Sequence, residues 1–371
     1  MLVAGATVYS ILAFGAALRP LRSACRPPES LPKATVLKPL RGWEPESYAC
    51  LRSFCDQDYP EFQIIFGVAA ADDPVLAVVQ RLQEEFPQRD LRILIDRRQH
   101  GSSRKVSNLI NMMSQASHDY LVIADSDVCV DDRYLANIVA PLVDSGVGVV
   151  TCAYRGVPRR GLWSLLGSLF INEWFTPSVY VAAKTGSRSF AFGATIALRR
   201  EVLSQIGEFR AIANHLADDY RLGELTRRLG LRTVLSDVEV DVVVAESSFG
   251  SLVQHELRWL RTIRAVRPLS YSLCFVTFGF PLALLGAFLS RGDSTALIML
   301  AITAAARFLL HLKRRQSHVS AAQIALVPVR DCLSLVLWAW SFTNRRVKWR
   351  DEHYQVSRDG SALPLGENLI L

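Results

Sequence analysis

The residues best suited to chemistry are two carboxylates, Asp125 and Asp127, which follow the apolar run at residues 120–124. If that run is a buried strand, its alternation places both side chains on one side of the chain, where they can share a cation. Carboxylate oxygens suit Mg²⁺ or Mn²⁺, and such a metal would neutralise the charge of a departing diphosphate. The alternative is a turn in which Asp125 caps the next helix, and the pair alone does not separate the two interpretations.

Other charged residues allow the same two kinds of interpretation. Asp72 and Asp73 precede Pro74, which is typical of a helix N-terminus and equally compatible with contact to a ligand. Lys105 lies at the start of another predicted helix, where it is either simply solvated or placed to meet a phosphate.

Two more carboxylates, Asp218 and Asp219, open a predicted helix that runs to about Arg228. One interpretation is that they cap this helix. The other is that one carboxylate acts as a general base on an acceptor hydroxyl, which requires a carboxylate that does not bind the metal.

A basic helix is predicted around His255, and it carries Arg258 and Trp259. Its arginines recur every third residue up to Arg267, but a helix turns about 300° over three residues, so they do not form one stripe. Either the arginines meet lipid headgroups from an interfacial helix, or Arg258 binds a pyrophosphate while Trp259 stacks near an acceptor. The two interpretations can hold for different arginines.

These residues are positioned by short apolar runs that alternate with helical patterns, which indicates an α/β fold with a mainly parallel sheet. Strands are predicted at 34–37, 62–69, 91–95 and 120–124, and helices at 74–86, 105–114 and 132–143. A second half contributes predicted strands at 190–198, 231–235 and 238–244. Ligands bind beyond the carboxyl ends of strands in such sheets, so Pro39, Asp72, Asp73 and Asp125 are the expected ligand-side residues.

Hydrophobic residues make up half of the 371-residue chain, and they are concentrated at its ends. Residues 1–19 are predicted to be a membrane anchor, because the apolar run is followed by Arg19, Arg22 and Arg26. A Pro-containing linker follows at 20–33, a cytosolic catalytic domain at 34–248 and an amphipathic interfacial helix at 249–268. We expect a membrane region at 269–345 and a cytosolic tail at 346–371.

Within the predicted membrane region, residues 271–311 form a helical hairpin with a short polar tip. The segment at 321–342 contains Arg330 and Asp331 near its middle, which would be costly if they faced lipid. A re-entrant or interfacial segment, in which Arg330 and Asp331 pair with each other, is the preferred interpretation.

The net charge of +7 is not accompanied by the motifs of nucleic-acid-binding proteins, so anionic lipid is the expected partner. Seven cysteines form an odd set without a CxxC pair, which predicts neither a disulfide framework nor a zinc site. These features favour a catalytic domain in a reducing cytoplasm.

In this order, the elements resemble the membrane-bound, family 2-like glycosyltransferases of the GT-A fold, whose signature combines D, DxD, ED and (Q/R)xxRW. The match is closer to the ceramide glucosyltransferase family, family 21, through the segments at 36–42, 58–60, 72–74, 105–109, 219–220 and 258–259. Longer strings at 107–113, 190–198, 216–225 and 255–266 are most similar to the bacterial hopanoid-biosynthesis glycosyltransferases. The chain departs from the signature at His255, where the broader family has Gln or Arg.

The resemblance implies an inverting transfer of a sugar from a UDP-sugar to a lipid hydroxyl in the bacterial cytoplasmic membrane. It gives Asp219 the role of base and Arg258 and Trp259 roles at the reacting groups, with Asp218 and His255 as secondary candidates. Asp125 and Asp127 would hold Mn²⁺ or Mg²⁺, and Pro39, Asp72 or Asp73, Lys105 and Asp125 would contact the donor.

The resemblance also suggests the substrates. The acceptor implied by the hopanoid branch is a bacteriohopanetetrol-type lipid, with N-acetylglucosamine as the sugar, whereas the ceramide branch implies glucose on ceramide. A processive polysaccharide synthase and a membrane-associated scaffold without activity are the alternatives, but the scaffold does not explain carboxylates at strand ends in this order.

Overall fold

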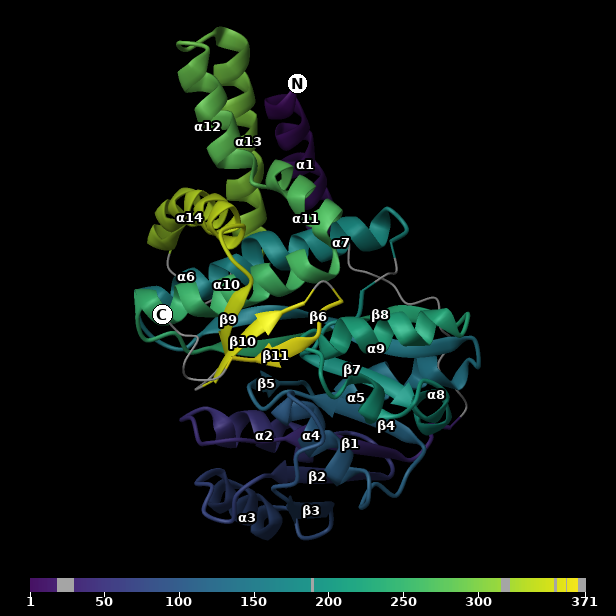
Figure 1. Cartoon of the computed structure of the whole chain (residues 1–371). Coiled ribbons are helices and arrows are strands. Elements are labelled where there is room, and N and C mark those ends of the chain that lie inside the picture. The colour runs from purple at the N-terminus through teal and green to yellow at the C-terminus, as the bar shows by residue number, and fades with distance from the viewer. Residues whose placement is uncertain (19–29, 188–189, 315–320, 350–351, 358, 366–371) are drawn as a thin grey trace. The chain divides into compact units, whose positions relative to one another are not determined.

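The computed structural model describes residues 1–18, 30–187, 190–314, 321–349, 352–357 and 359–365. The chain divides into two compact units (Figure 1). The sheet unit comprises Arg22–Tyr154 and Arg188–Val243, and the helical unit comprises Met1–Leu21, Arg155–Ser187 and Val244–Leu371. The predicted catalytic domain at 34–248 is therefore interrupted, because residues 155–187 belong to the helical unit. Most of the predicted linker at 20–33 lies outside the described residues.

Four parallel strands form one half of the central sheet, in the order β3-β2-β1-β4. They are β1 (Ala34–Pro39), β2 (Phe62–Val68), β3 (Asp90–Ile95) and β4 (Tyr120–Ala124). Every residue of β2 is buried, as expected for a parallel strand covered on both faces. The four predicted strands and the α/β class are confirmed.

The other half of the sheet continues as β7-β6-β8-β5. It contains β5 (Val128–Cys129), β6 (Val147–Pro158), β7 (Thr195–Arg199) and β8 (Arg232–Val244), with β7 antiparallel to β4 and β6. The prediction of a strand from residue 190 is wrong, because the chain at Phe192 bonds the Thr151 side chain instead of a strand ladder. The two strands predicted at 231–235 and 238–244 are one continuous strand.

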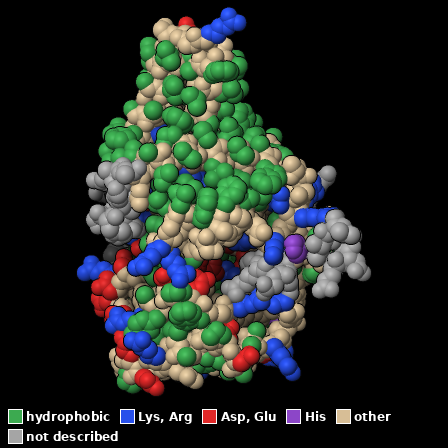
Figure 2. All heavy atoms as spheres, turned by 90° about the vertical axis from the view of Figure 1, so that its left-hand side faces the viewer, with side chains coloured by type: hydrophobic (Ala, Val, Ile, Leu, Met, Phe, Trp, Pro, Cys, Tyr) green, Lys and Arg blue, Asp and Glu red, His purple; other side chains and the backbone are tan. Residues whose placement is uncertain are grey.

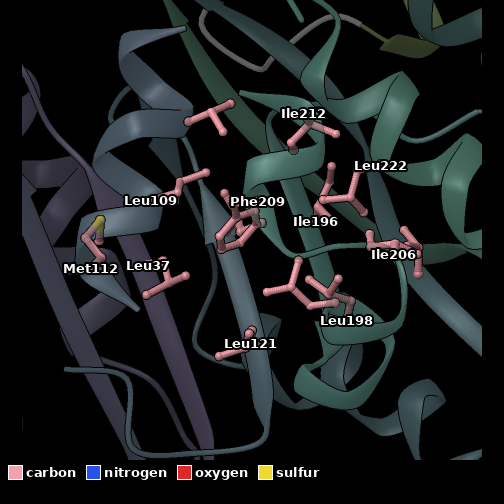
Figure 3. Packing of buried hydrophobic residues seen from close by; sticks show 14 of the residues in the cluster. Leu37, Leu109, Met112, Leu121, Ile196, Leu198, Ile206, Phe209, Ile212 and Leu222 are labelled. Atoms are coloured by element: carbon pink, nitrogen blue, oxygen red, sulfur yellow. The ribbon is translucent and has the colours of Figure 1, made fainter. Parts of the chain in front are cut away.

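Helices and one hydrophobic cluster complete the sheet unit. The helices are α2 (Ser47–Cys55), α3 (Val75–Glu85), α4 (Arg104–Met112), α5 (Tyr134–Val139), η1 (Ala140–Val143), α8 (Arg200–Gln205), η3 (Phe209–Ile212) and α9 (Asp218–Arg228). In Figure 3, Leu109 of α4 and Phe209 of η3 pack with Leu37 of β1 and Leu121 of β4. The Ser103 hydroxyl accepts a hydrogen bond from the Val106 N–H and so caps α4. This cap stabilises the first turn of α4.

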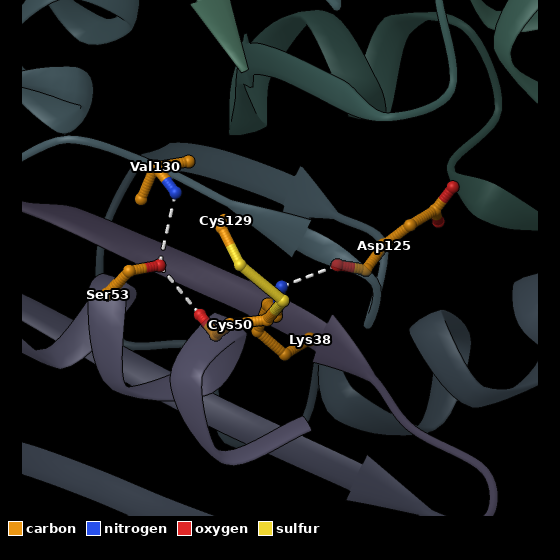
Figure 4. Close-up of a disulfide and its surroundings, with 6 residues drawn as sticks. All are labelled: Lys38, Cys50, Ser53, Asp125, Cys129 and Val130. Carbon is orange, nitrogen blue, oxygen red and sulfur yellow. Dashed lines mark hydrogen bonds between the residues drawn. A yellow bond between two sulfur atoms is a disulfide. The ribbon is translucent and has the colours of Figure 1, made fainter. Parts of the chain in front are cut away.

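A disulfide joins Cys50 of α2 to Cys129 of β5, 79 residues apart (Figure 4). The neighbouring Ser53 hydroxyl donates to the Cys50 carbonyl and accepts from the Val130 N–H. The cysteine pattern, which predicted no disulfide framework, does not reveal this pair, because the proximity of Cys50 and Cys129 depends on the sheet topology and not on their spacing. The disulfide therefore links α2 covalently to β5, the short strand that follows Asp127.

The helical unit contains a membrane-type bundle formed by α1 (Leu2–Leu18), α12 (Gly279–Leu289) and α13 (Ser294–Arg314) (Figure 1). Exposed hydrophobic side chains such as Phe288 and Ile298 cover the α12–α13 hairpin (Figure 2). Two helices, Ser294–Arg314 and Gln323–Trp340, are long and apolar enough to cross a membrane, and a bent pair would make a third.

The predicted hairpin at 271–311 is present, but its first arm is broken. Pro268–Thr277 and Gly279–Leu289 meet at a 64° bend. The first part consists of α11 (Pro268–Leu273) and η4 (Cys274–Thr277). The tip at Arg291 and Gly292 has positive φ angles of 55° and 80°, which close the turn into α13.

Small side chains allow α1 to pack closely on the hairpin. Ala6 and Ala13 are buried, and the hydroxyls of Thr7 and Thr303 are 3.0 Å apart. A Cβ atom on Gly279 would lie 2.1 Å from the Ser10 Oγ. Close contact through small residues and interhelical hydrogen bonds is typical of helix packing in membranes. The N-terminal apolar helix is therefore an integral part of the helical unit.

Replacing Gly279 by Val is expected to lower the free energy of unfolding by about 1–3 kcal/mol, because the new side chain overfills the contact with Ser10. Thermal unfolding of the detergent-solubilised protein measures this change. Gly15→Val in α1 is the matched control, since nothing lies within 4 Å of a Cβ at that position. Equal shifts for the two variants would contradict the assigned packing.

The segment predicted at 321–342 forms η5 (Ala321–Ala325) and α14 (Leu326–Ser341). The predicted pairing between Arg330 and Asp331 is wrong, because consecutive helical residues point about 100° apart. Arg330 instead donates two hydrogen bonds to Glu256, and Arg307 of α13 donates two to Asp331. Both charges of α14 are buried and paired with other helices.

Three further helical segments precede α10 (Phe249–Val266) in this unit: α6 (Leu162–Phe170), the π-helical turn η2 (Ile171–Phe175) and α7 (Thr176–Lys184). A π-turn leaves backbone carbonyls without their usual α-helical partners. In η2, the Glu173 carbonyl accepts a hydrogen bond from Arg307, and the Glu173 side chain lies 2.8 Å from His311 Nδ1. The turn is thus tied to α13.

The predicted tail at 346–371 contains a three-stranded antiparallel sheet of β9 (Arg346–Trp349), β10 (Glu352–Val356) and β11 (Ala362–Pro364). Arg261 donates to the Arg346 carbonyl, and Arg264 donates to the carbonyls of Ser341 and Asn344. These two arginines therefore bind backbone carbonyls in the segment that runs from the end of α14 to β9. Residues 366–371 lie outside the described part of the chain.

Candidate active site

Asp125 and Asp127 follow β4 at the carboxyl end of the parallel strands. Their backbone is held on both sides, because the Asp125 N–H donates to the Ala194 carbonyl and the Asp127 carbonyl accepts from the Val243 N–H. Both side chains are only half-buried. The loop that presents the carboxylates is therefore fixed to the antiparallel half of the sheet.

Lys105 connects the two pairs of aspartates. From the first turn of α4, its Nζ lies 2.6 Å from Asp125 Oδ1 and 3.5 Å from Asp218 Oδ2. Burial opposes the charge of Lys105, but Asp125, Asp218 and Asp219 outweigh it and raise the pKa of the ammonium. The structure thus places Asp125, Lys105, Asp218 and Asp219 in one cluster.

A second lysine, Lys38 of β1, contacts Asp125 of this cluster and was given no role from the sequence. Its buried Nζ donates to the Asp125 carbonyl at 2.5 Å (Figure 4). The same nitrogen lies 3.8 Å from the centroid of the Phe54 ring. Burial lowers its pKa to about 7, although Asp125 and Asp127 act in the opposite direction. The available signal was a single charged residue at the end of an apolar strand.

Two of the carboxylates are shifted toward their neutral forms. Loss of solvent and the neighbouring Asp218 raise the pKa of Asp219 to about 7, and loss of solvent and Asp125 raise that of Asp127 to about 6. Asp219 Oδ1 accepts a hydrogen bond from the Tyr220 N–H, and a Cβ on Gly193 would lie 3.1 Å from Oδ2. Gly193 therefore leaves space beside one oxygen of this carboxylate.

The remaining donor-side residues differ in what they contact. Asp73 accepts hydrogen bonds from the N–H groups of Gly42 and Val75, so it holds a loop and the start of α3. Asp72 is exposed and Pro39 is half-buried at the end of β1. Asp73 thus has the structural role that its position before Pro74 predicts, and Asp72 is the more accessible of the two.

Arg258, Trp259 and His255 belong to the helical unit and lie on α10. His255 Nδ1 bonds Glu246, and its ring meets Trp259 edge-on with centroids 5.1 Å apart. The Trp259 ring also lies 6.2 Å from Phe170 and 6.0 Å from Phe175. This part of α10 therefore combines polar groups with an aromatic wall.

A divalent cation fits the chemistry of Asp125 and Asp127, which offer hard oxygen ligands on one loop. The raised pKa of Asp127 indicates carboxylates in need of a compensating cation. Among the described residues, no group of three or more His, Cys, Asp or Glu side chains is arranged for a metal. A site based on two carboxylates leaves coordination positions for phosphate oxygens and water, as Mg²⁺ prefers.

Comparison with solved structures identifies the fold. The chain is similar to a mannosyltransferase from Pyrobaculum calidifontis, solved in complex with GDP-Man and Mn²⁺, at a TM-score of 0.54 and 21% sequence identity. The similarity covers 92% of this chain and 95% of that one. The predicted GT-A fold is therefore confirmed.

Curated relatives are ceramide glucosyltransferases. The chain is 36% identical to the enzyme of Komagataella phaffii over 119 residues, which cover 31% of this chain and 23% of the relative. It is 21% identical to ceramide glucosyltransferase 3 of Caenorhabditis elegans over 243 residues, or 64% of this chain and 52% of the relative. The chain thus spans about half or less of the length of these relatives.

The model of one protein family matches residues 1–362, including both hydrophobic ends and the whole candidate site. Its description is "Glycosyl transferase family 21", in agreement with the predicted resemblance. Because this match covers nearly the entire sequence, the chain belongs to glycosyl transferase family 21.

Proposed function

We propose that the protein is an inverting, metal-dependent glycosyltransferase that moves a sugar from a UDP-sugar to a hydroxyl of a membrane lipid. The observation that carries this proposal is the cluster of Asp125, Lys105, Asp218 and Asp219 at the carboxyl end of the sheet. The cluster contains Asp125, which can bind a cation, and Asp219, a separate carboxylate that can accept a proton. The helices of the membrane-type bundle support a lipid as acceptor.

Asp219 is the proposed general base. A carboxylate whose pKa is about 7 can accept a proton effectively near neutral pH, because its basicity is greater than that of an ordinary aspartate. The Tyr220 N–H holds one carboxylate oxygen, and the space at Gly193 admits a hydroxyl beside the other. Asp219 then takes the hydroxyl proton as the acceptor oxygen attacks the anomeric carbon and the bond to the diphosphate breaks.

Asp125 and Asp127 would hold Mn²⁺ or Mg²⁺. When bound, the cation supplies positive charge to the oxygens of the nucleoside diphosphate. Lys105 pairs with Asp125 and Asp218, and Lys38 donates a hydrogen bond to the Asp125 carbonyl. Arg258 is assigned to the departing diphosphate, Trp259 to the acceptor, and Asp72, Pro39 and Lys105 to the donor.

The proposed acceptor is a hopanoid of the bacteriohopanetetrol type, with N-acetylglucosamine as the sugar. The strings at 107–113, 190–198, 216–225 and 255–266 support this choice through their resemblance to the hopanoid branch. The relatives named ceramide glucosyltransferases support the alternative, glucose transfer to ceramide. The proposed location is the bacterial cytoplasmic membrane, with the sheet unit in the cytoplasm. Arg19, Arg22 and Arg26 after the N-terminal apolar run support this orientation. The cysteines do not support it, since Cys50 and Cys129 are paired.

The test is to incubate membranes that contain the protein with labelled UDP-N-acetylglucosamine or UDP-glucose, and with hopanoid or ceramide acceptors. Mass spectrometry of the lipid extract should show one added sugar per lipid, and nuclear magnetic resonance should show an inverted anomeric centre. Membranes with the Asp219→Asn variant are the control. A polymeric product would favour a processive synthase, and no product with any pair would contradict the proposal.

A further inference from the structure

A positive charge of the protein itself lies on one of the two proposed metal ligands. Nζ of Lys105 is 2.6 Å from Oδ1 of Asp125, and only 15% of the lysine side chain is exposed. An ammonium group at this distance donates a charge-assisted hydrogen bond to the carboxylate. One oxygen of Asp125 is therefore bound to a cation that belongs to the sheet unit.

The backbone that carries Lys105 is held against the segment that leads to Asp218. The N–H of Ser103, which caps α4, donates to the Ala213 carbonyl at 2.9 Å. A Cβ atom on Gly101 would lie 2.5 Å from the same carbonyl oxygen, so the two chain segments approach as closely as a glycine allows. Movement of the Lys105 charge is therefore a matter of its side chain and not of its backbone.

A second carboxylate is within reach of the same ammonium group. Oδ2 of Asp218 lies 3.5 Å from Nζ of Lys105, and 15% of the Asp218 side chain is exposed. A lysine ammonium carries three donors on a flexible four-carbon stem. Lys105 can therefore release Asp125 and still keep a carboxylate partner.

A divalent cation and Lys105 compete for the carboxylate of Asp125. Two positive charges on one carboxylate repel each other, so each weakens the binding of the other. The other lysine of the site, Lys38, donates to the backbone carbonyl of Asp125 and not to its carboxylate (Figure 4). A nucleoside diphosphate relieves the competition, because its oxygens can accept from an ammonium group and bind Mn²⁺ or Mg²⁺ at the same time.

We propose that Lys105 is the resident counter-cation of Asp125 and yields this carboxylate to a divalent cation when a nucleoside diphosphate arrives to receive the ammonium group. Lys105 thereby makes the binding of metal and nucleotide depend on each other. The inference rests on the proposed function and adds a form of regulation to it: the enzyme retains little metal until the nucleotide is present.

The test measures Mn²⁺ binding to the whole, detergent-solubilised chain by electron paramagnetic resonance, with and without UDP. Without UDP, Lys105→Met should bind Mn²⁺ about 5-fold more tightly than the wild type, as expected for the loss of one partly exposed competing charge. With saturating UDP this advantage should disappear, because Lys105 of the wild type then contacts the diphosphate. UDP should therefore strengthen Mn²⁺ binding about 5-fold less in Lys105→Met than in the wild type.

Two further variants separate the charge of Lys105 from its bulk. Lys105→Arg keeps the positive charge and should bind Mn²⁺ without UDP as weakly as the wild type. Lys33→Met is the matched control, because it removes the same charge from an exposed lysine that pairs with Glu61 in the same unit. Its Mn²⁺ affinity should equal that of the wild type, and thermal unfolding shows that each variant is folded.

Equal or weaker Mn²⁺ binding by a folded Lys105→Met variant without UDP would overturn the inference, since a lysine with a merely structural role gives that result. An effect of UDP that is equally large in Lys105→Met and in the wild type would overturn it as well. Absence of Mn²⁺ binding by the wild type even in the presence of UDP would instead contradict the metal site of the proposed function.

Discussion

Replacing Asp219 by Asn should lower the rate of sugar transfer by about 10²- to 10⁴-fold, the usual contribution of a general base. The affinity for the UDP-sugar should remain close to that of the wild type, because the amide occupies the same space and Asp219 is assigned to the acceptor. Single-turnover kinetics and nucleotide-sugar titration measure the two quantities separately. Glu224→Gln is the matched control, because Glu224 is a half-buried carboxylate of the same helix that pairs with Arg221 and Arg228.

The pH dependence supplies an independent check of this assignment. Asp219 must be deprotonated to act as a base, so kcat/KM should rise with pH through about 7 and level off above it. Near-normal transfer by Asp219→Asn, or a wild-type profile that is flat from pH 5.5 to 8.5, would remove Asp219 from this role.

Stability should change in the opposite direction to activity. Because the pKa of Asp219 is raised from 3.8 to about 7, the folded state binds more protons than the unfolded state between these values. The stability that Asp219 contributes to the folded state is therefore lost as the pH rises from 3.8 to about 7. At pH 8, Asp219→Asn should be more stable than the wild type by on the order of 1–2 kcal/mol, allowing for solvent screening. Thermal unfolding at pH 4 and pH 8 tests this, and an equal difference at both would contradict it.

Asp127→Ala should weaken metal-dependent binding of the UDP-sugar by about 10- to 100-fold, the loss expected for one interaction with a charged group. Titration with and without Mn²⁺ measures it, and the metal-independent part of the affinity should be unaffected. Asp132→Ala is the control, because Asp132 is an exposed carboxylate in the same region. If Mn²⁺ enhances binding equally in Asp127→Ala and the wild type, the metal is held elsewhere.

The parallel half of the sheet was predictable because local patterns determine it. Apolar runs such as 62–68 are buried on both faces, and their spacing leaves room for the intervening helices. The carboxylates at Asp125 and Asp127 were predictable for the same reason, since they follow such a run directly.

Contacts between distant residues were not predictable. The contacts of Lys105 with Asp218, of Lys38 with Asp125 and of Glu246 with His255 join residues that are not neighbours in the sequence. They form because the fold brings particular strand ends and helices together, and local patterns do not contain this information. The disulfide between Cys50 and Cys129 was missed for the same reason. The strand prediction that began at residue 190 failed because the residues before β7 bond side chains and the Asp125 loop.

The two buried charges of α14 constrain how the helical unit is assembled. Arg330 and Asp331 have their partners on α10 and α13, which are both synthesised earlier. An unpaired charge in a membrane is costly, so α14 on its own is a poor candidate for insertion. Once Glu256 and Arg307 are present, they can pair with Arg330 and Asp331, and α14 then carries no unpaired charge into the membrane. The order of synthesis therefore matches the order in which these charges can be neutralised, and α14 closes the bundle after its partners have emerged from the ribosome.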